Sequence, residues 1–381
     1  MRGILNIVRV GWQAGIVRIV WLPMTSTPAL HATYIEAREA FLSAASAAGA
    51  RVEHHLHPLT GPSGEELAID VAELGPEDAT NAVLVVSGTH GVEGYCGSAL
   101  QTGWLAGHAA ERPADTAVVF VHALNPFGFA WVRRVNEDNV DLNRNFVDWD
   151  APLPLNEGYE RLAGDMVPED WSDAVQERTS TTLLEIGAEM GFDEFATAVS
   201  GGQFLHPQGV FYGGSGPVWS HRWLTDWSSK RFSAVERLAI LDLHTGLGPW
   251  GHGELISSEH HRSAAYERSR AWWDDITSMA DGDSVSAPLE GDWLAAATEF
   301  CPGPEITSIA IEYGVIDSIS VVQALRADAW LHAYGDPTGP LAPGIRAATR
   351  AAFADDDPAW MDAVWPKFHD TLERTFRGLA G

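Results

Sequence analysis

The sequence predicts an α/β protein with a mixed, mostly parallel twisted sheet covered by helices on both faces. Four short apolar runs carry this prediction: NAVLVVS at 81–87, TAVVFVHA at 116–123, LAILDL at 238–243 and TSIAIEY at 307–313. Continuous apolar runs of this length, bounded by turn residues, are typical of strands buried on both faces. Helical patterns separate the runs, and strands that alternate with helices favour a three-layer α/β/α arrangement.

The first third of the chain supplies the remaining clear elements. Residues 29–49 have the pattern of an amphipathic helix that ends at Gly49. Residues 51–57 and 66–72 indicate two strands around the turn at 60–64. A further helix is expected to begin near Glu93 and to continue past Leu105.

The middle of the chain interrupts the regular alternation. Residues 151–200 are acidic and mostly helical in pattern, and residues 201–216 form a Gly-rich stretch. Nothing after residue 24 resembles a linker between domains. We therefore predict one domain over 24–381, with an acidic helical insertion around 151–200.

The first 23 residues differ from the rest because they carry three arginines and no acid. The arginines break the apolar runs, so no stretch reaches the roughly 20 residues that a membrane span needs. One interpretation is a basic amphipathic helix at a surface. The favoured one is a mis-assigned start, with the protein beginning at Met24 and remaining in the cytoplasm.

Charge and cysteine content limit the possible partners. Lys and Arg number 24 and Asp and Glu 52, so the net charge is 24 − 52 = −28. Such a charge repels nucleic acid and anionic membranes and favours a small-molecule or short peptide substrate. Cys96 and Cys301 do not form a CxxC motif, which favours reduced thiols, with one disulfide between them as the alternative. These features are compatible with an oligomer as well as with a monomer.

Polar residues follow the buried strands and suggest a shared site, since ligands of open α/β sheets bind beyond the carboxyl ends of strands. His90 and Glu93 lie three residues apart after the first run, and His244 ends the third. Two imidazoles and a carboxylate are a ligand set for catalytic zinc, with one position left open for water. One zinc ion per chain is therefore expected. The alternative without a metal is a glutamate that begins a helix beside an ordinary loop histidine.

A longer series of motifs then resembles the zinc carboxypeptidase family. HxxE is followed by NPFG at 125–128, Arg134, DLNRNF at 141–146, DLH at 242–244 and Glu312, in the family's order. The acylamino-acid deacylases, aspartoacylase and succinylglutamate desuccinylase, look like a related branch. The stretches GTHGVEG, HPQGVFYGG and LDLHTGLGPWG look closest to an uncharacterised bacterial subgroup. The resemblance implies a zinc carboxypeptidase/phosphorylase-hydrolase-like fold.

The resemblance also implies roles for matching residues. His90, Glu93 and His244 match the zinc ligands, and Asp141 matches an aspartate that hydrogen-bonds a ligand histidine. Glu312 matches the glutamate that assists attack by zinc-bound water and then passes the proton to the leaving amine. The remaining matches concern the substrate: Arg134 for the scissile carbonyl, and Asn143 with Arg144 for a free carboxylate.

Several of these assignments have alternatives. Arg133 competes with Arg134, Asp141 could cap a turn, and Arg144 could belong to a structural ion pair. The family also uses a mobile tyrosine, for which Tyr212, Tyr266 and Tyr313 are candidates without deciding context. Two loops are possible pocket walls: 201–216 with His206 and Tyr212, and 246–253 with Trp250. Two histidine clusters, His54–His57 and His260–His261, are expected to be a solvated strand and a surface segment without a nearby partner.

The expected function is a zinc-dependent hydrolase that cleaves an amide bond next to a free carboxylate. A carboxypeptidase would release a C-terminal residue from a peptide, whereas a deacylase would cleave an N-acyl amino acid. A non-catalytic, zinc-stabilised binding protein on the same scaffold is the third alternative.

Overall fold

The computed structural model describes residues 12–13, 16–17 and 27–381 of the chain. The predicted N-terminal extension, residues 1–23, lies largely outside the described residues; only the short antiparallel pair β1 (Trp12–Gln13) and β2 (Ile16–Val17) belongs to it. None of the described helices is long and apolar enough to cross a membrane.

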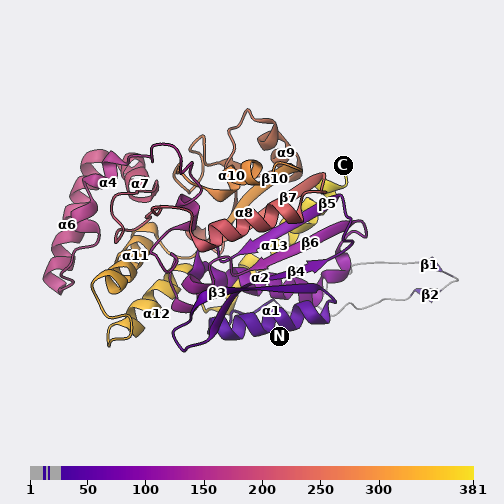
Figure 1. Ribbon diagram of the computed structural model, residues 1–381, viewed down its shortest axis with the longest axis horizontal. Helices are drawn as coiled ribbons and strands as arrows, with labels where there is room; N and C mark the ends of the chain where they lie inside the picture. Colours follow the sequence, from indigo (N-terminus) through magenta and orange to yellow (C-terminus); the bar gives the residue numbers. More distant parts are fainter. Residues whose placement is uncertain (1–11, 14–15, 18–26) are drawn as a thin grey trace.

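An eight-stranded mixed sheet forms the centre of the described fold, in the order β3-β4-β6-β5-β7-β10-β8-β9 (Figure 1). The central strands β6, β5, β7 and β10 are parallel to one another, and antiparallel pairings occur only toward the two edges. The strands are β3 (Arg51–Thr60), β4 (Glu66–Leu74), β5 (Asn81–Ser87), β6 (Thr116–His122), β7 (Arg237–Trp250), β8 (Gly253–Ser257), β9 (Ile276–Ser278) and β10 (Glu305–Gly314).

Helices cover both faces of the sheet, which confirms the predicted three-layer order. One face packs against α1 (Tyr34–Ala47), α2 (Gly94–Gly107) and α13 (Pro358–Leu379). The other packs against α8 (Trp219–Arg231) and α10 (Trp293–Phe300). Alternate residues of each central strand enter the two cores, because neighbouring side chains of a strand point to opposite faces. Leu241 and Leu243 therefore lie in the first core, and Leu238 and Ile240 in the second.

The predicted acidic insertion is helical and lies at one end of the molecule. It contains α4 (Glu157–Glu160), α5 (Ala163–Met166), α6 (Asp173–Met190) and α7 (Phe192–Ser200). These helices gather beside α11 (Ser318–Ala333) and α12 (Ala342–Phe353) (Figure 1). Arg326 of α11 fixes the contact, since its guanidinium donates to the Met166 carbonyl and to the Thr179 hydroxyl, both at 2.8 Å.

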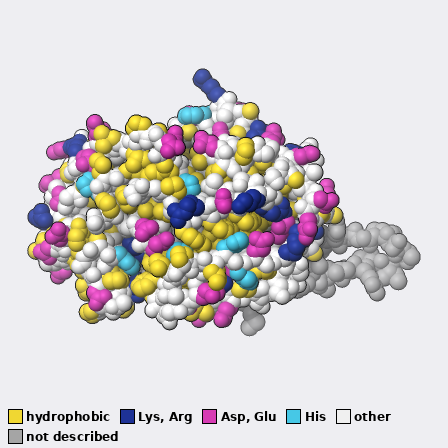
Figure 2. Space-filling model, in the orientation of Figure 1, with side chains coloured by type: hydrophobic (Ala, Val, Ile, Leu, Met, Phe, Trp, Pro, Cys, Tyr) yellow, Lys and Arg dark blue, Asp and Glu magenta, His cyan; other side chains and the backbone are white. Residues whose placement is uncertain are grey.

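The remaining short elements occupy the connections between the layers. They are η1 (Gly91–Glu93), η2 (Ala109–Glu111), α3 (Pro126–Trp131), η3 (Leu142–Arg144) and α9 (Ala264–Trp272). On the face shown in Figure 2, acidic side chains are spread over the surface and its rim rather than gathered in one patch. The large negative charge therefore gives this face no single acidic binding surface.

Parts of the sheet were not predicted from the sequence. β8 and β9 were not predicted, and β7 continues through residues expected to be a loop, as far as Trp250. Gly246 and Gly248 within this extension have φ of 135° and 101°, which only glycine adopts without strain. Two glycines in a short segment predicted a turn, whereas residues 246–249 form a bulge after which Trp250 pairs again with Gly314 of β10.

The two histidine clusters, His54–His57 and His260–His261, agree only in part with the predictions. His57 is buried rather than solvated, with its Nε2 3.3 Å from Glu137 Oε1 and its ring against Trp219. His260 and His261 are exposed as predicted, but both have a partner in Asp281. That carboxylate comes from 20 residues further along the chain, so local sequence could not show it.

A buried histidine in the core gives a prediction about acid stability. His122 of β6 is fully buried, stacks on Phe41 with ring centroids 4.5 Å apart, and has Nε2 2.9 Å from Ser98 Oγ. Burial lowers the pKa of His122 to about 4. Between that pH and 6.5 the unfolded chain binds a proton that the folded protein excludes, so this residue lowers stability as the pH falls through the window.

His122→Phe should remove this contribution while the ring still packs on Phe41. We expect the free energy of unfolding of the wild type to decline more steeply between pH 6.5 and 4.5 than that of the variant, by up to about 1.4 kcal/mol per pH unit. Urea titrations at several pH values measure the difference. Parallel slopes for the two proteins would contradict it, and His260→Phe at an exposed position serves as the control.

Candidate metal centre and substrate cavity

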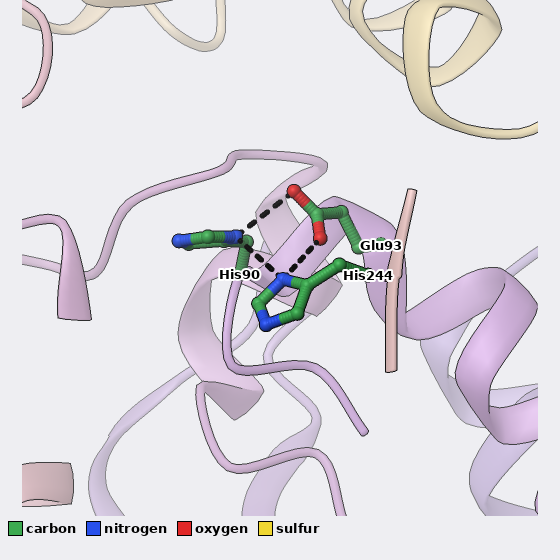
Figure 3. A group of neighbouring side chains, drawn as sticks. All are labelled: His90, Glu93 and His244. Atoms are coloured by element: carbon green, nitrogen blue, oxygen red, sulfur yellow. Dashed lines mark hydrogen bonds and ion pairs between the residues drawn. The ribbon is translucent and has the colours of Figure 1, made fainter. Parts of the chain in front are cut away.

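The three residues predicted as metal ligands come together in the structure, although His244 lies far from the other two in sequence. His90 follows β5, Glu93 ends η1, and His244 lies in β7 next to β5. All three are buried, and their ligand atoms lie within 4.8 Å of one another (Figure 3). Parallel neighbouring strands explain the convergence, because their carboxyl ends meet at one edge of the sheet.

The donor atoms of this centre are closely spaced. His90 Nδ1 lies 2.9 Å from Glu93 Oε1, and His244 Nδ1 lies 2.9 Å from Glu93 Oε2. The two Nδ1 atoms are 3.2 Å apart. Donors bound to one tetrahedral zinc at about 2.0–2.2 Å are separated by roughly 3.3 Å, so the observed spacing fits one ion.

The outer nitrogens of both imidazoles are held by carboxylates. His90 Nε2 is 3.0 Å from Asp141 Oδ1, and His244 Nε2 is 2.6 Å from Asp242 Oδ2. With a hydrogen donated to each carboxylate, both Nδ1 atoms present a lone pair to the space that Glu93 also faces. Three acceptors then surround one point, an arrangement that requires positive charge there. The residues present therefore fit a zinc ion.

The electrostatics of the ligands agree with this requirement. Burial raises the pKa of Glu93, but His90 and His244 outweigh burial and lower it below its usual range. Burial lowers the pKa of His244, but the charge of Asp242 and its hydrogen bonds outweigh burial and raise it well above the ordinary value. The centre thus holds its carboxylate ionised and attracts either a proton or a metal ion.

Asp242 contacts the candidate ligand His244, a relation for which the sequence analysis made no prediction. It accepts hydrogen bonds from the Thr89 hydroxyl at 2.7 Å and from Trp293 Nε1 at 2.8 Å, besides its contact with His244. A signal was available, because residues two apart on a strand share a face. The Asp-Leu-His order therefore places Asp242 beside the same imidazole.

Asp242→Asn should weaken zinc binding, because the amide supports the His244 imidazole less strongly than the carboxylate does. Loss of such a partner typically costs 10- to 100-fold in metal affinity. A competition titration against a fluorescent zinc chelator measures this change. Asp226→Asn, an exposed position on α8, is the matched control, and equal affinities of the two variants would remove Asp242 from this role.

Glu312 lies beside the metal centre on β10. It is the direct register partner of His244 in the β7–β10 pairing, and its Oε1 accepts from the Leu247 amide at 2.9 Å. It is only 8% exposed and lines the cavity described below. Burial and the charge of Glu93 raise the pKa of Glu312 to about 8. A carboxyl group with such a pKa can both take up and release a proton near neutral pH.

Arg134 and Arg133 are clearly separated by the structure. Arg134 donates to Asp141 Oδ2 at 2.9 Å and to Glu93 Oε1 at 2.8 Å, and it lines the cavity. Arg133 is buried away from the centre and pairs with Asp328 at 3.0 Å. Of the two competing residues, only Arg134 contacts the His90–Glu93–His244 group. Asp141 fulfils both interpretations proposed for it. It contacts the His90 imidazole, and it also caps η3 by accepting from the Asn143 amide.

Asn143 and Arg144 also line the cavity. Asn143 Oδ1 is buried and has no hydrogen-bond partner among the described residues. The Arg144 guanidinium donates to the carbonyls of Ser200 and Asn143, and Asp141, its ion-pair partner in the described chain, is 4.0 Å away. Burial lowers the pKa of Arg144 to about 10, so it stays protonated at neutral pH. A buried cation and an unsatisfied amide suit a polar ligand group.

The cavity has a volume of about 520 Å³ and begins at these polar residues. Most of its wall is apolar and comes from α6, α7, α11 and the segment 284–289, through residues such as Leu183, Phe192, Phe195, Val199, Val285, Leu289, Ile319, Val322 and Leu325. Phe192 and Ile319 are 78% and 60% exposed, which places them at its mouth. The acidic insertion therefore builds one wall, which its sequence pattern did not indicate.

Both loops proposed as pocket walls contribute, but through other residues than those named. In the Gly-rich loop, Phe211 lines the cavity and lies 5.3 Å from the guanidinium carbons of both Arg134 and Arg144. His206 instead pairs with Glu160 near the surface. In the other segment, Leu247 and Gly248 line the cavity, whereas the Trp250 side chain turns to Asp355.

The family's mobile tyrosine has no counterpart among the three candidates. Tyr313 follows Glu312 directly, so its side chain points to the opposite face of the sheet, where it is fully buried. Tyr266 donates to the Ile276 carbonyl, and the Tyr212 ring lies in the core beneath α8. Among the described residues, the cavity lining contains no tyrosine.

Comparison with known proteins gives a family and a set of distant structural relatives. Residues 31–367 match the family described as "Protein of unknown function (DUF2817)". The chain belongs to this family. A search of curated proteins found no match to this DUF2817 member.

Solved structures similar to this DUF2817 chain include members of both branches that the motifs suggested. They are the succinylglutamate desuccinylase from Chromobacterium violaceum (15% identity, 79% of this chain and 74% of that chain, TM-score 0.37), carboxypeptidase A from Helicoverpa armigera (14%, 85% and 74%, 0.43) and an aspartoacylase family protein from Mesorhizobium loti (15%, 76% and 68%, 0.36). The relation is distant, so the proposals below depend on the geometry of this chain.

Proposed function

We propose that this DUF2817 protein is a zinc-dependent hydrolase that cleaves an amide bond next to a free carboxylate. The observation that carries the proposal is the position of Glu312. This buried carboxyl lies directly beside the convergent lone pairs of His90, His244 and Glu93, in one cavity with a buried guanidinium.

The residues of the cavity divide the chemistry among them. Zinc, when bound, supplies Lewis-acid activation of the scissile carbonyl and of water. Glu312 takes the proton of the attacking water and delivers it to the leaving amine. Arg134 is the nearest guanidinium to the centre, and it stabilises negative charge that develops on the carbonyl oxygen. Phe211 packs against the guanidinium groups of both Arg134 and Arg144.

Arg144 and Asn143 hold the carboxylate of the substrate. A guanidinium can bind a carboxylate through two parallel hydrogen bonds, which fixes the adjacent amide relative to Glu312. The apolar wall beyond them suits a bulky hydrophobic group. A peptide with an apolar C-terminal region and an amino acid with an apolar N-acyl group both meet these requirements, so the carboxypeptidase and deacylase versions of the proposal are both retained.

A panel of paired substrates tests the proposal. Zinc-loaded protein is incubated with peptides and with N-acyl amino acids that bear apolar groups, each with a free or an amidated carboxylate, and released amine is quantified. We expect turnover in one of the two series, reduced at least tenfold by amidation. Turnover insensitive to amidation would overturn the role of Arg144, and no turnover in either series would favour the non-catalytic binding protein.

A further inference from the structure

A second group of metal-ligating side chains lies away from the cavity, where α2 ends against α13. His108 caps the C-terminus of α2, Glu111 ends η2, and His369 lies on α13. Their ligand atoms also lie within 4.8 Å of one another. Glu93 immediately precedes α2, whose 14 residues span about 20 Å, so this group is well separated from the first centre.

The geometry of this group matches that of the first centre. His108 Nδ1 is 2.8 Å from Glu111 Oε1, His369 Nε2 is 3.1 Å from Glu111 Oε2, and the two nitrogens are 3.0 Å apart. The corresponding distances in the first centre are 2.9, 2.9 and 3.2 Å. The spacing of histidine and glutamate along the chain is also the same, at three residues in both.

Hydrogen bonds alone cannot satisfy all three contacts among His108, Glu111 and His369. His108 Nδ1 and His369 Nε2 face each other and each also faces a carboxylate oxygen. If both nitrogens donate to Glu111, two N–H groups oppose each other at 3.0 Å; if only one is protonated, the lone pair of the other faces the carboxylate. A divalent cation among the three groups removes this conflict.

The surroundings suit a structural ion with a position open to water. The side chains of His108 and His369 are 13% and 23% exposed, whereas that of Glu111 is 46% exposed. Trp365 packs against both imidazoles, with ring centroids 5.5 and 5.9 Å away, and limits their rotation. Two imidazoles and one carboxylate are a donor set for zinc and neighbouring transition metals.

We propose that His108, Glu111 and His369 form a second zinc site, which fastens the C-terminal helix α13 to the end of α2. α13 lies against α2 and closes one core of the protein (Figure 1), so the ion links segments about 260 residues apart in the chain. This site takes no part in hydrolysis. The proposal does not depend on the function proposed above.

Zinc content and thermal unfolding test the proposal in the tag-free full chain. Protein stripped with a chelator is reloaded at micromolar free zinc, separated from excess metal and measured by elemental analysis. We expect about two zinc ions in the wild type and one in both His369→Ala and Glu111→Gln. His244→Ala should retain the second ion, and the double variant H244A/H369A should bind none.

The thermal readout separates a structural ion from a surface contaminant. Zinc should raise the unfolding temperature of His244→Ala, and this rise should disappear in H244A/H369A. His252→Ala, at an exposed position on the turn between β7 and β8, should behave like the wild type. Wild-type zinc content in both His369→Ala and Glu111→Gln would overturn the proposal, as would a His244→Ala variant that binds no zinc while remaining folded.

Discussion

Glu312→Gln is expected to abolish most hydrolysis while the metal centre remains intact. Glu312 is not one of the three convergent donors, so zinc binding at His90, Glu93 and His244 should persist. The amide cannot accept the proton of the attacking water, and general acid–base catalysis of this kind contributes about 10²- to 10⁴-fold. We therefore expect kcat/KM to fall by that factor, with unchanged zinc content.

The fold should tolerate this change. Burial raises the pKa of Glu312 to about 8, so in the metal-free protein the carboxyl is largely protonated at pH 7 and the neutral amide resembles it in shape and charge. An unchanged unfolding temperature of the metal-free variant would show this. Glu305→Gln, at the exposed start of the same strand, is the control. Wild-type activity of Glu312→Gln would remove Glu312 from the mechanism.

His244→Ala should empty the proposed catalytic centre and leave no measurable hydrolysis. The substitution removes one of three donors and deprives Asp242 and Glu93 of their contacts with the imidazole at 2.6 and 2.9 Å. Loss of a residue that merely supports a ligand already costs 10- to 100-fold in affinity, so loss of the ligand itself should exceed about 100-fold. Zinc affinity at this centre and kcat/KM are the two measurements.

A second histidine substitution serves as the control for His244→Ala. His260→Ala removes an exposed imidazole that pairs with Asp281, and it should change neither measurement. Addition of excess zinc should partly restore activity to His244→Ala if weakened binding is the cause. A variant with wild-type affinity at this centre and wild-type turnover would exclude the His90–Glu93–His244 centre as the site of hydrolysis.

For residues close together on one strand, the sequence alone can predict which side chains share a face. Alternation along a strand places Asp242 and His244 on one face and Tyr313 opposite Glu312. The first relation predicts a carboxylate beside the His244 imidazole, and the second excludes Tyr313 from the cavity. Neither needed the tertiary structure. The extension of β7 past Gly246 did need it, because only the tertiary structure shows that Trp250 pairs again with β10 after the bulge that holds the two glycines.

Sequence by itself determined the four central strands, predicted at 81–87, 116–123, 238–243 and 307–313, and the positions of His90, Glu93, His244 and Glu312 in or after them. Local periodicity and chain order are enough for this, since parallel neighbours end at one edge of the sheet. The tertiary structure alone decided that Phe211 contacts two arginines, that the insertion forms a wall of the cavity, and that His369 meets His108. Such contacts join distant segments through packing, and no local pattern in the chain records which segments will meet.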